Sequence, residues 1–258
     1  SAAHDARLFK GNSLDLLPKL CAGDAPRVIF ADPPYFLSGG GSTCHGGNRV
    51  SVNKGDWDKA QGIADIHAFN RRWLKVCQEI MHPDGTIWVS GTAHVIYSVG
   101  FAMQELGMKL LNTITWEKPN PPPNLSCRYF THATETILWA ARDSSSKHLF
   151  NYGDMKKENG GKQMKSVWRL SAPGKREKLH GKHPTQKPIA LLDRILRASA
   201  NPGDLVVDPF NGSGTTGVAA LNLGMRYIGV DREKKYLDLS RSRLDEFAPV
   251  LDMAKDSA

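Results

Sequence analysis

The residues with the clearest chemical potential form the tetrapeptide Asp32-Pro33-Pro34-Tyr35, which directly follows the apolar run Arg27–Ala31. That run is typical of a buried strand, and open α/β sheets bind ligands at the carboxyl ends of their strands. The two prolines remove two N–H donors, so the Asp32 carboxylate and nearby carbonyl oxygens form a set of acceptors. Acceptors that hold both hydrogens of an exocyclic amine localise the nitrogen lone pair for attack. Tyr35 adds a flat ring on which a flipped base can stack.

A second motif, Asp208–Gly217, follows the strand-like run Leu205–Val207 and precedes a predicted helix. Its glycines have G-x-G-x-x-G spacing, and Asp231 closes the next predicted strand, where an acid can bind ribose hydroxyls. This pattern predicts a cofactor that contains a nucleoside. Taken alone, it is also compatible with NAD or with a tight glycine turn that binds nothing. A strand-ending turn is likewise the alternative for the tetrapeptide, but the two motifs together favour a ligand site.

Net charge and its distribution favour a polyanionic partner. The chain has a formal charge of +8 and a pI of about 9.3. From Lys165 to Lys187 it carries seven Lys or Arg residues against one acid, Glu177. A solvated loop would explain this stretch equally well, so a DNA-backbone contact depends on the other motifs.

The four cysteines, Cys21, Cys44, Cys77 and Cys127, form no CxxC pair. We therefore expect free thiols, no disulfide and no metal. None follows a proline, so none resembles the nucleophile of enzymes that methylate C5 of cytosine. No apolar run approaches the roughly 20 residues that span a membrane, and the N-terminus lacks the apolar core of a signal peptide. The expected location is the cytoplasm.

Strand and helix signals alternate, which predicts a single α/β domain over residues 1–258, with a mostly parallel, twisted sheet and helices on both faces. We expect a mobile glycine-rich loop at about 38–56, with no regular structure from Ser38 to Asn48, and a basic insertion at about 143–182. The predicted strands are 27–31, 86–90, 111–116, 136–141, 205–208 and 226–230. The predicted helices are 65–81, 94–106, 188–200, one from 215 and one from about 233.

With these motifs in place, nearly the whole chain resembles the β-group amino-methyltransferases of restriction–modification systems. In that group the tetrapeptide precedes the glycine motif, which is a circularly permuted order of the Rossmann-like fold that binds S-adenosylmethionine. The resemblance implies catalytic roles for Asp32, Pro33, Pro34 and Tyr35. Many members carry Asp where this chain has Asn12, whose side-chain carbonyl can still accept from the cofactor adenine. The cofactor contacts implied are Asn12, His183, Pro184, Thr185, Lys187, Asp208, Phe210, Asn211, Gly212, Ser213, Gly214, Thr215, Thr216 and Asp231.

Three longer stretches, Phe36–Ser38, Val50–Asp58 and Asn124–His132, resemble the DpnA-type GATC adenine methyltransferases. They imply N6 of adenine as the methyl acceptor and GATC as the recognition sequence, with N4 of cytosine as the alternative. A nicotinamide-dependent oxidoreductase is the alternative from another class. It would explain the glycine motif and Asp231, but neither the tetrapeptide nor the late position of the glycine motif.

The resemblance also implies contacts with double-stranded DNA, and the sequence leaves single-stranded DNA open as a substrate. Lys54 and Trp57 are expected to close over DNA or the flipped base, although Trp57 could instead belong to the core. Arg128 and His132 are further candidates, and a structural role explains His132 equally well. A homodimer is expected, as is a cognate restriction endonuclease that forms no stable complex. Phosphate contacts are predicted for Lys175, Arg176 and Lys178.

Overall fold

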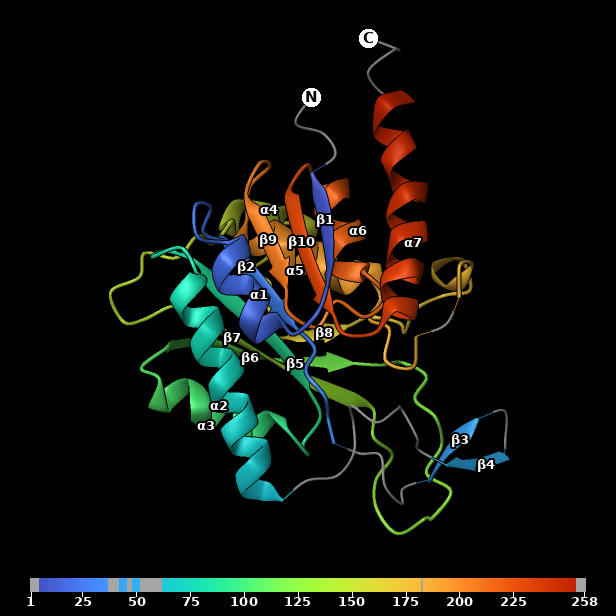
Figure 1. The fold of residues 1–258 in the computed structure, drawn as a ribbon. Helices are drawn as coiled ribbons and strands as arrows, with labels where there is room; N and C mark the ends of the chain where they lie inside the picture. The colour runs from blue at the N-terminus through green and yellow to red at the C-terminus, as the bar shows by residue number, and fades with distance from the viewer. Residues whose placement is uncertain (1–4, 37–41, 46–47, 52–61, 182, 254–258) are drawn as a thin grey trace.

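The computed structural model describes residues 5–36, 42–45, 48–51, 62–181 and 183–253. Within them, eight strands form one sheet with the order β1-β10-β9-β2-β5-β7-β6-β8 (Figure 1). Every neighbouring pair is parallel except the two that involve β7. The expected mostly parallel sheet is therefore confirmed. The strands are β1 Ala6–Lys10, β2 Val28–Ala31, β5 Thr86–Gly91, β6 Lys109–Glu117, β7 Thr134–Ala141, β8 Val167–Arg169, β9 Leu205–Asp208 and β10 Arg226–Asp231.

Helices cover both faces of this sheet, as the alternating pattern predicts. Along β2, Val28 packs in one apolar cluster and Ile29 in the other, because successive strand residues point to opposite faces. Helices α1 Ser13–Leu20, α2 Ile63–Ile80 and α3 Ile96–Glu105 contribute to the cluster of Ile29. Helices α5 Ile189–Ser199 and α6 Thr215–Asn222 contribute to that of Val28. Double burial explains why these central strands read as continuous apolar runs.

The topology creates a crevice between β2 and β9, which are neighbours in the sheet. From β2 the chain continues through α2 to β5 on one side, whereas from β9 it continues through α6 to β10 on the other. Connections that diverge in this way leave a gap above the carboxyl ends of the two strands, where ligands of doubly wound sheets bind. Asp32 follows β2 and Asp208 ends β9, so both motifs meet at this gap.

The expectation of no regular structure from Ser38 to Asn48 is wrong for the described part of that segment. Strands β3 Ser42–His45 and β4 Asn48–Ser51 pair antiparallel as a hairpin separate from the main sheet (Figure 1). Two short strands can satisfy each other's backbone groups without any apolar periodicity. Mobility of this loop stays a prediction, and Lys54 and Trp57 lie outside the described residues.

Described residues 143–181 of the predicted insertion are closely packed against the rest of the domain. Helix α4 Tyr152–Glu158 packs against α5, and β8 extends the sheet beside β6. Met155 and Trp168 are buried, and the Trp168 ring lies 6.2 Å from that of Trp88. Each of these short elements buries only one large side chain, which left little periodicity to detect.

Helix α7 Lys234–Met253 closes the domain against α6 and β1. No helix in the described residues is long and apolar enough to cross a bilayer.

Candidate functional site

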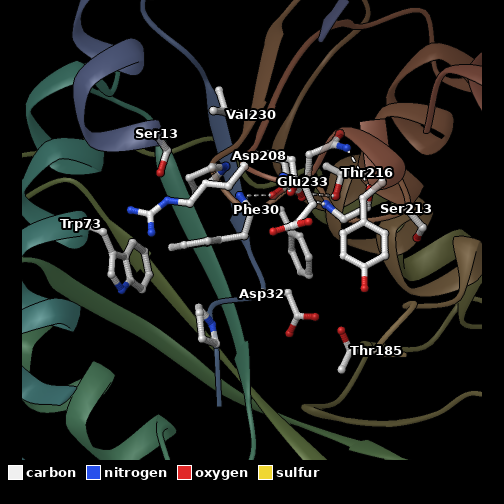
Figure 2. Close-up of a pocket in the computed structure, with 18 of the residues that line it drawn as sticks. Ser13, Phe30, Asp32, Trp73, Thr185, Asp208, Ser213, Thr216, Val230 and Glu233 are labelled. Carbon is white, nitrogen blue, oxygen red and sulfur yellow. Dashed lines mark hydrogen bonds between the residues drawn. The ribbon is translucent and has the colours of Figure 1, made fainter. Parts of the chain in front are cut away.

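A cavity of about 490 Å³ lies above the carboxyl ends of β2 and β9. This volume falls in the range of small-molecule sites, roughly 300 to 1,000 Å³. Figure 2 shows Asp32 and Asp208 at its centre, with Trp73 on one side and Ser213 on the other. The structure thus brings together residues from distant parts of the sequence. The predicted cofactor residues that line the cavity are Asn12, His183, Thr185, Lys187, Asp208, Phe210, Asn211, Gly212, Ser213, Thr215, Thr216 and Asp231.

Two predicted cofactor residues, Pro184 and Gly214, are not among the residues that line the cavity. Gly214 caps the start of α6 with a φ of +71°. A Cβ atom there would lie 2.0 Å from the Ser240 hydroxyl of α7. This glycine is therefore required for close packing beneath the loop, and its place in the structure gives it no direct contact with the cavity.

The glycine loop is held between two carboxylates. Gly212, with a φ of +48°, donates its backbone N–H to Asp231 Oδ2 at 2.8 Å. Asp208 accepts from the Phe210 amide at 2.9 Å and from Thr216 Oγ1 at 2.6 Å. Burial raises the pKa of Asp208 to about 7, although both of these hydrogen bonds act to lower it. Burial also raises the pKa of Asp231. A cationic ligand would favour the ionised form of both acids.

The acid of the tetrapeptide belongs to a buried polar cluster. Tyr35 donates its hydroxyl to Asp32 Oδ1 at 2.6 Å, and Lys187 Nζ lies 2.7 Å from Asp32 Oδ2 and 3.1 Å from the Tyr35 oxygen. Burial raises the pKa of Asp32, against the lowering effect of Lys187. Burial acts to lower the pKa of Lys187, but Asp32 and Glu135 outweigh it and the pKa is raised. Lys187 is predicted as a cofactor residue, and the structure places its ammonium group on the side chains of the tetrapeptide.

The tetrapeptide contributes to the cavity through Asp32 and Pro34, whereas Pro33 is buried. Tyr35 is only 5% exposed and does not line the cavity. The ring that does so is that of the next residue, Phe36, which has a φ of +55°. Stacking of a base on Tyr35 stays a prediction, and it would require the ring to become more accessible than it is here.

Two aromatic residues of the cavity wall and an acid beside Lys187 were not assigned to the site by the sequence. Phe69 and Trp73 line the cavity from α2 together with Phe210, whose ring meets that of Trp73 edge-on at 5.4 Å. The spacing of Phe69 and Trp73 along α2 marks them only as residues of its apolar face. That pattern could not distinguish residues that line a cavity from residues of the core. The acid is Glu135 at the start of β7, whose Oε2 lies 3.4 Å from Lys187 Nζ. No motif in the sequence marked it.

The predicted DNA contacts fall on two described segments. Residues 118–133 join β6 to β7 at the end of the sheet where Asp32 lies, because β6 ends and β7 begins at the carboxyl ends of β2 and β5. Arg128 and His132 are exposed in this segment, beside Phe130, whose side chain is 97% exposed. The sequence did not single out Phe130, although an aromatic residue beside two basic ones was a usable signal.

The second segment contains Lys175, Arg176 and Lys178, all exposed around a short 3-10 turn. The Glu177 side chain accepts from the Ile189 amide at 2.8 Å, and the backbone carbonyl of Glu177 accepts from Gln186 Nε2 at 2.7 Å. These bonds attach the basic turn to the segment that reaches Asp32 through Lys187. The phosphate contacts themselves stay a prediction.

The structure shows free thiols among the cysteines. Cys21, Cys77 and Cys127 are free thiols. In the described part of the chain, no three His, Cys, Asp or Glu side chains are grouped so that they could hold a metal ion.

Comparison with known proteins gives concordant matches. A family model described as "DNA methylase" matches residues 27–242. The chain is 58% identical over 219 residues to the type II methyltransferase M2.DpnII of Streptococcus pneumoniae, covering 84% of this chain and 82% of that protein. It is 54% identical over 245 residues to M2.LlaDCHI of Lactococcus lactis subsp. cremoris, covering 95% and 91%.

Two solved structures share the fold. The M1.HpyAVI–SAM complex matches with a TM-score of 0.66 and 24% identity, covering 93% of this chain and 99% of that one. The PvuII cytosine-N4-specific DNA methyltransferase matches with a TM-score of 0.72 and 18% identity, covering 96% and 92%. The expected methyltransferase fold is therefore confirmed.

Proposed function

Because this chain belongs to the DNA methylase family, we propose that it methylates N6 of adenine within a short DNA sequence. The methyl donor is S-adenosyl-L-methionine. The observation that carries the proposal is the meeting of Asp32 with the glycine loop in one cavity. An acceptor for an amine and a site for a nucleoside cofactor then lie side by side. GATC is the proposed recognition sequence, by the resemblance of residues 36–38, 50–58 and 124–132.

The cavity has the groups that this cofactor requires. Asp231 and the rings of Phe69, Trp73 and Phe210 line the cavity. In the proposed complex, Asp231 accepts from the ribose hydroxyls of the cofactor, and the rings offer apolar surface to its adenine. Gln186 lines the cavity, and its buried Oε1 has no hydrogen-bond partner in the described part of the chain. An unsatisfied buried acceptor is costly, and because this oxygen is closed to the cavity, a bound ligand would reach it only if the Gln186 side chain moved.

In the proposed mechanism, the cofactor supplies a methyl group bound to a sulfonium ion. Asp32 holds the target amine in line with that group, and both its oxygens keep a second acceptor position beside their bonds to Tyr35 and Lys187. The N–C bond forms as the C–S bond breaks, and sulfur keeps the electron pair. The methylated nitrogen is then cationic and loses a proton readily, so Asp32 need not be a strong base. Alignment supplies most of the acceleration.

The proposal is tested by methylating plasmid DNA and reading the product base by base with long-read sequencing. The expected result is N6-methyladenine at a single short site. N4-methylcytosine would overturn the choice of base but keep amine methylation, which matters because the fold is shared with a cytosine-N4-specific enzyme. Absence of any methylated base would overturn the activity. Binding of NAD in place of S-adenosylmethionine would favour the oxidoreductase alternative.

Asp208 makes cofactor affinity depend on pH. Its pKa of about 7 in the free enzyme must fall when a cation binds nearby. The affinity for S-adenosylmethionine should therefore rise with pH and level off above about 7, because no proton then has to leave. Calorimetric titrations between about pH 5 and pH 8 measure this rise. Thr216→Val removes a bond that lowers the pKa of Asp208 and should move the plateau to higher pH. An unchanged profile in Asp208→Asn would contradict this origin.

The basic turn should account for part of the salt dependence of DNA binding. Changing Lys175, Arg176 and Lys178 together to Gln should reduce the slope of log K against log salt by about 3, because each phosphate that a cation neutralises adds roughly 0.9 to the slope. Fluorescence anisotropy with a DNA duplex at several salt concentrations measures the slope. The control changes Lys156, Lys157 and Lys162 to Gln, since these three lysines are exposed in or just after α4. Helix α4 starts beside the carboxyl end of α5, whereas the basic turn is bonded to the amino end of α5. An unchanged slope in the first variant would mean that its charges form only a solvated face.

We further propose that the enzyme serves a restriction–modification system in the cytoplasm, beside an endonuclease that it does not bind stably. A homodimer is the proposed assembly. Ile63 of α2 and Tyr97 of α3 are 87% and 77% exposed, and Phe101 is 56% exposed. Exposed apolar side chains grouped on two packed helices favour a protein contact. Sedimentation of the wild type against Tyr97→Glu measures the assembly, and a monomeric wild type would exclude it.

A further inference from the structure

Glu135 belongs to a chain of alternating charges that begins at Lys118 and ends at Asp32. Its Oε1 is bonded to Lys118, which follows β6, its Oε2 lies 3.4 Å from Lys187 Nζ, and Lys187 in turn lies 2.7 Å from Asp32. The Glu135 side chain is 12% exposed and that of Lys187 is 6% exposed. Two further hydroxyls, of Tyr35 and Ser90, lie 3.4 Å from Glu135 Oε2.

Glu135 remains charged in this position. Burial alone would raise the pKa of Glu135, yet Lys187 and Lys118 lower it to about 2. The two acids and two lysines of the cluster therefore sum to zero charge. Without the carboxylate of Glu135, the same cluster would carry one net positive charge next to the acceptor of the target amine.

The sign of that charge matters for the proposed reaction. Methyl transfer moves positive charge from sulfur onto the amine nitrogen held by Asp32, and Lys187 already places an ammonium beside that carboxylate. Like charges in a buried site oppose each other much more strongly than in water. Glu135 does not line the cavity, so it acts on the amine without touching it, through its contact with Lys187 and through its charge near Asp32.

We propose that Glu135 is a positioning residue for methyl transfer. It attracts the ammonium group of Lys187 and cancels the excess positive charge, so that Asp32 can stabilise the cationic amine. This inference rests on the proposed amine methylation. Lys118 pairs with Glu135 on the side away from Lys187. Glu135 is required because, without it, the positive charge of Lys118 would be uncompensated. The role differs from that of Asp32, because Glu135 touches neither the base nor the cofactor.

The test is single-turnover methylation of a DNA duplex that contains the site found for the wild type. Glu135→Gln should lower the rate by roughly 10- to 100-fold, while the Kd values for DNA and S-adenosylmethionine stay close to those of the wild type. Lys118→Gln/Glu135→Gln returns the cluster to zero charge and should recover most of the lost rate. Glu117→Gln removes an acid next to Lys118 that pairs with Arg169 instead, and should leave the rate unchanged.

A pH profile separates positioning from damage to the structure. Glu135 raises the pKa of Asp32, so Glu135→Gln should move the acid limb of the rate profile to lower pH. A merely structural loss would lower the profile without moving it. An unchanged rate in Glu135→Gln, or a double variant as slow as the single one, would overturn the proposal. If Glu135→Gln does not fold, the double variant is compared with the wild type, and a rate lower than that of the wild type by about 10-fold or more would overturn the proposal. Failure of the proposed function is distinct, because the wild type would then not methylate.

Discussion

Asp32→Ala should nearly abolish methyl transfer, by about 1,000-fold or more, while the affinity for S-adenosylmethionine stays close to that of the wild type. The carboxylate is the group placed at the cavity to hold the target amine, and no other side chain of the tetrapeptide offers the same acceptor there. The proposed cofactor contacts, in contrast, come mainly from the glycine loop and Asp231. Single-turnover incorporation of labelled methyl groups and calorimetric titration with the cofactor measure the two effects separately.

Removal of Asp32 also deprives Lys187 of its shortest ionic contact. Breaking a buried pair destabilises a protein by about 3 to 5 kcal/mol when the remaining charge is uncompensated, but Glu135 still faces Lys187 here. Asp32→Asn keeps the shape of the site and therefore separates catalytic loss from unfolding. Asp193→Asn is the matched control, because Asp193 lies on α5 away from the cavity and pairs with Arg197. Turnover retained in both Asp32 variants would sink the assignment of this residue.

Gly212→Asp should have the opposite effect and weaken S-adenosylmethionine binding first, by about 100-fold or more. Gly212 has a φ of +48°, and a Cβ atom there would lie 3.2 Å from the His183 ring. The added carboxylate would stand beside Asp231, which accepts from the Gly212 amide. Steric contact and like charge therefore both act on the cofactor loop. The dissociation constant from calorimetric titration is the direct measurement.

Strain from the backbone conformation needs its own control. Gly160→Asp introduces the same side chain at a φ of +64°, where a Cβ atom meets nothing within 4 Å. This variant should bind the cofactor as the wild type does, with at most a small loss of thermal stability. If Gly212→Asp bound the cofactor normally, the glycine loop would not be the cofactor site, whatever its effect on folding.

Elements with strong periodicity were predictable from the sequence. Helix α2 was expected at 65–81 and lies at Ile63–Ile80, and β9 coincides with the predicted strand. In these elements local pattern and tertiary burial agree, because each buries a continuous apolar face. The β3–β4 hairpin, α4 and β8 were missed because they are short. Strand β8 has three residues, of which only Trp168 is buried, so its place was decided by pairing with β6.

Part of the candidate site was likewise predictable from the sequence, and part was not. Asp32-Pro33-Pro34-Tyr35 and Asp208–Gly217 are local motifs, because close approach of a ligand to the backbone demands particular residues at adjacent positions. The sequence by itself therefore determined the cofactor class, the amine chemistry and the parallel α/β frame. Only the tertiary structure decided that Lys187 contacts Asp32, that Phe36 lines the cavity while Tyr35 is buried, and that Glu135 completes the cluster. The contacts among Asp32, Lys187 and Glu135 join segments that are distant along the chain. Asp32 and Glu135 meet because β2 ends and β7 begins at the same end of the sheet, and the segment before α5 brings Lys187 between them. Such neighbours leave no pattern in sequence spacing, because strand order sets them.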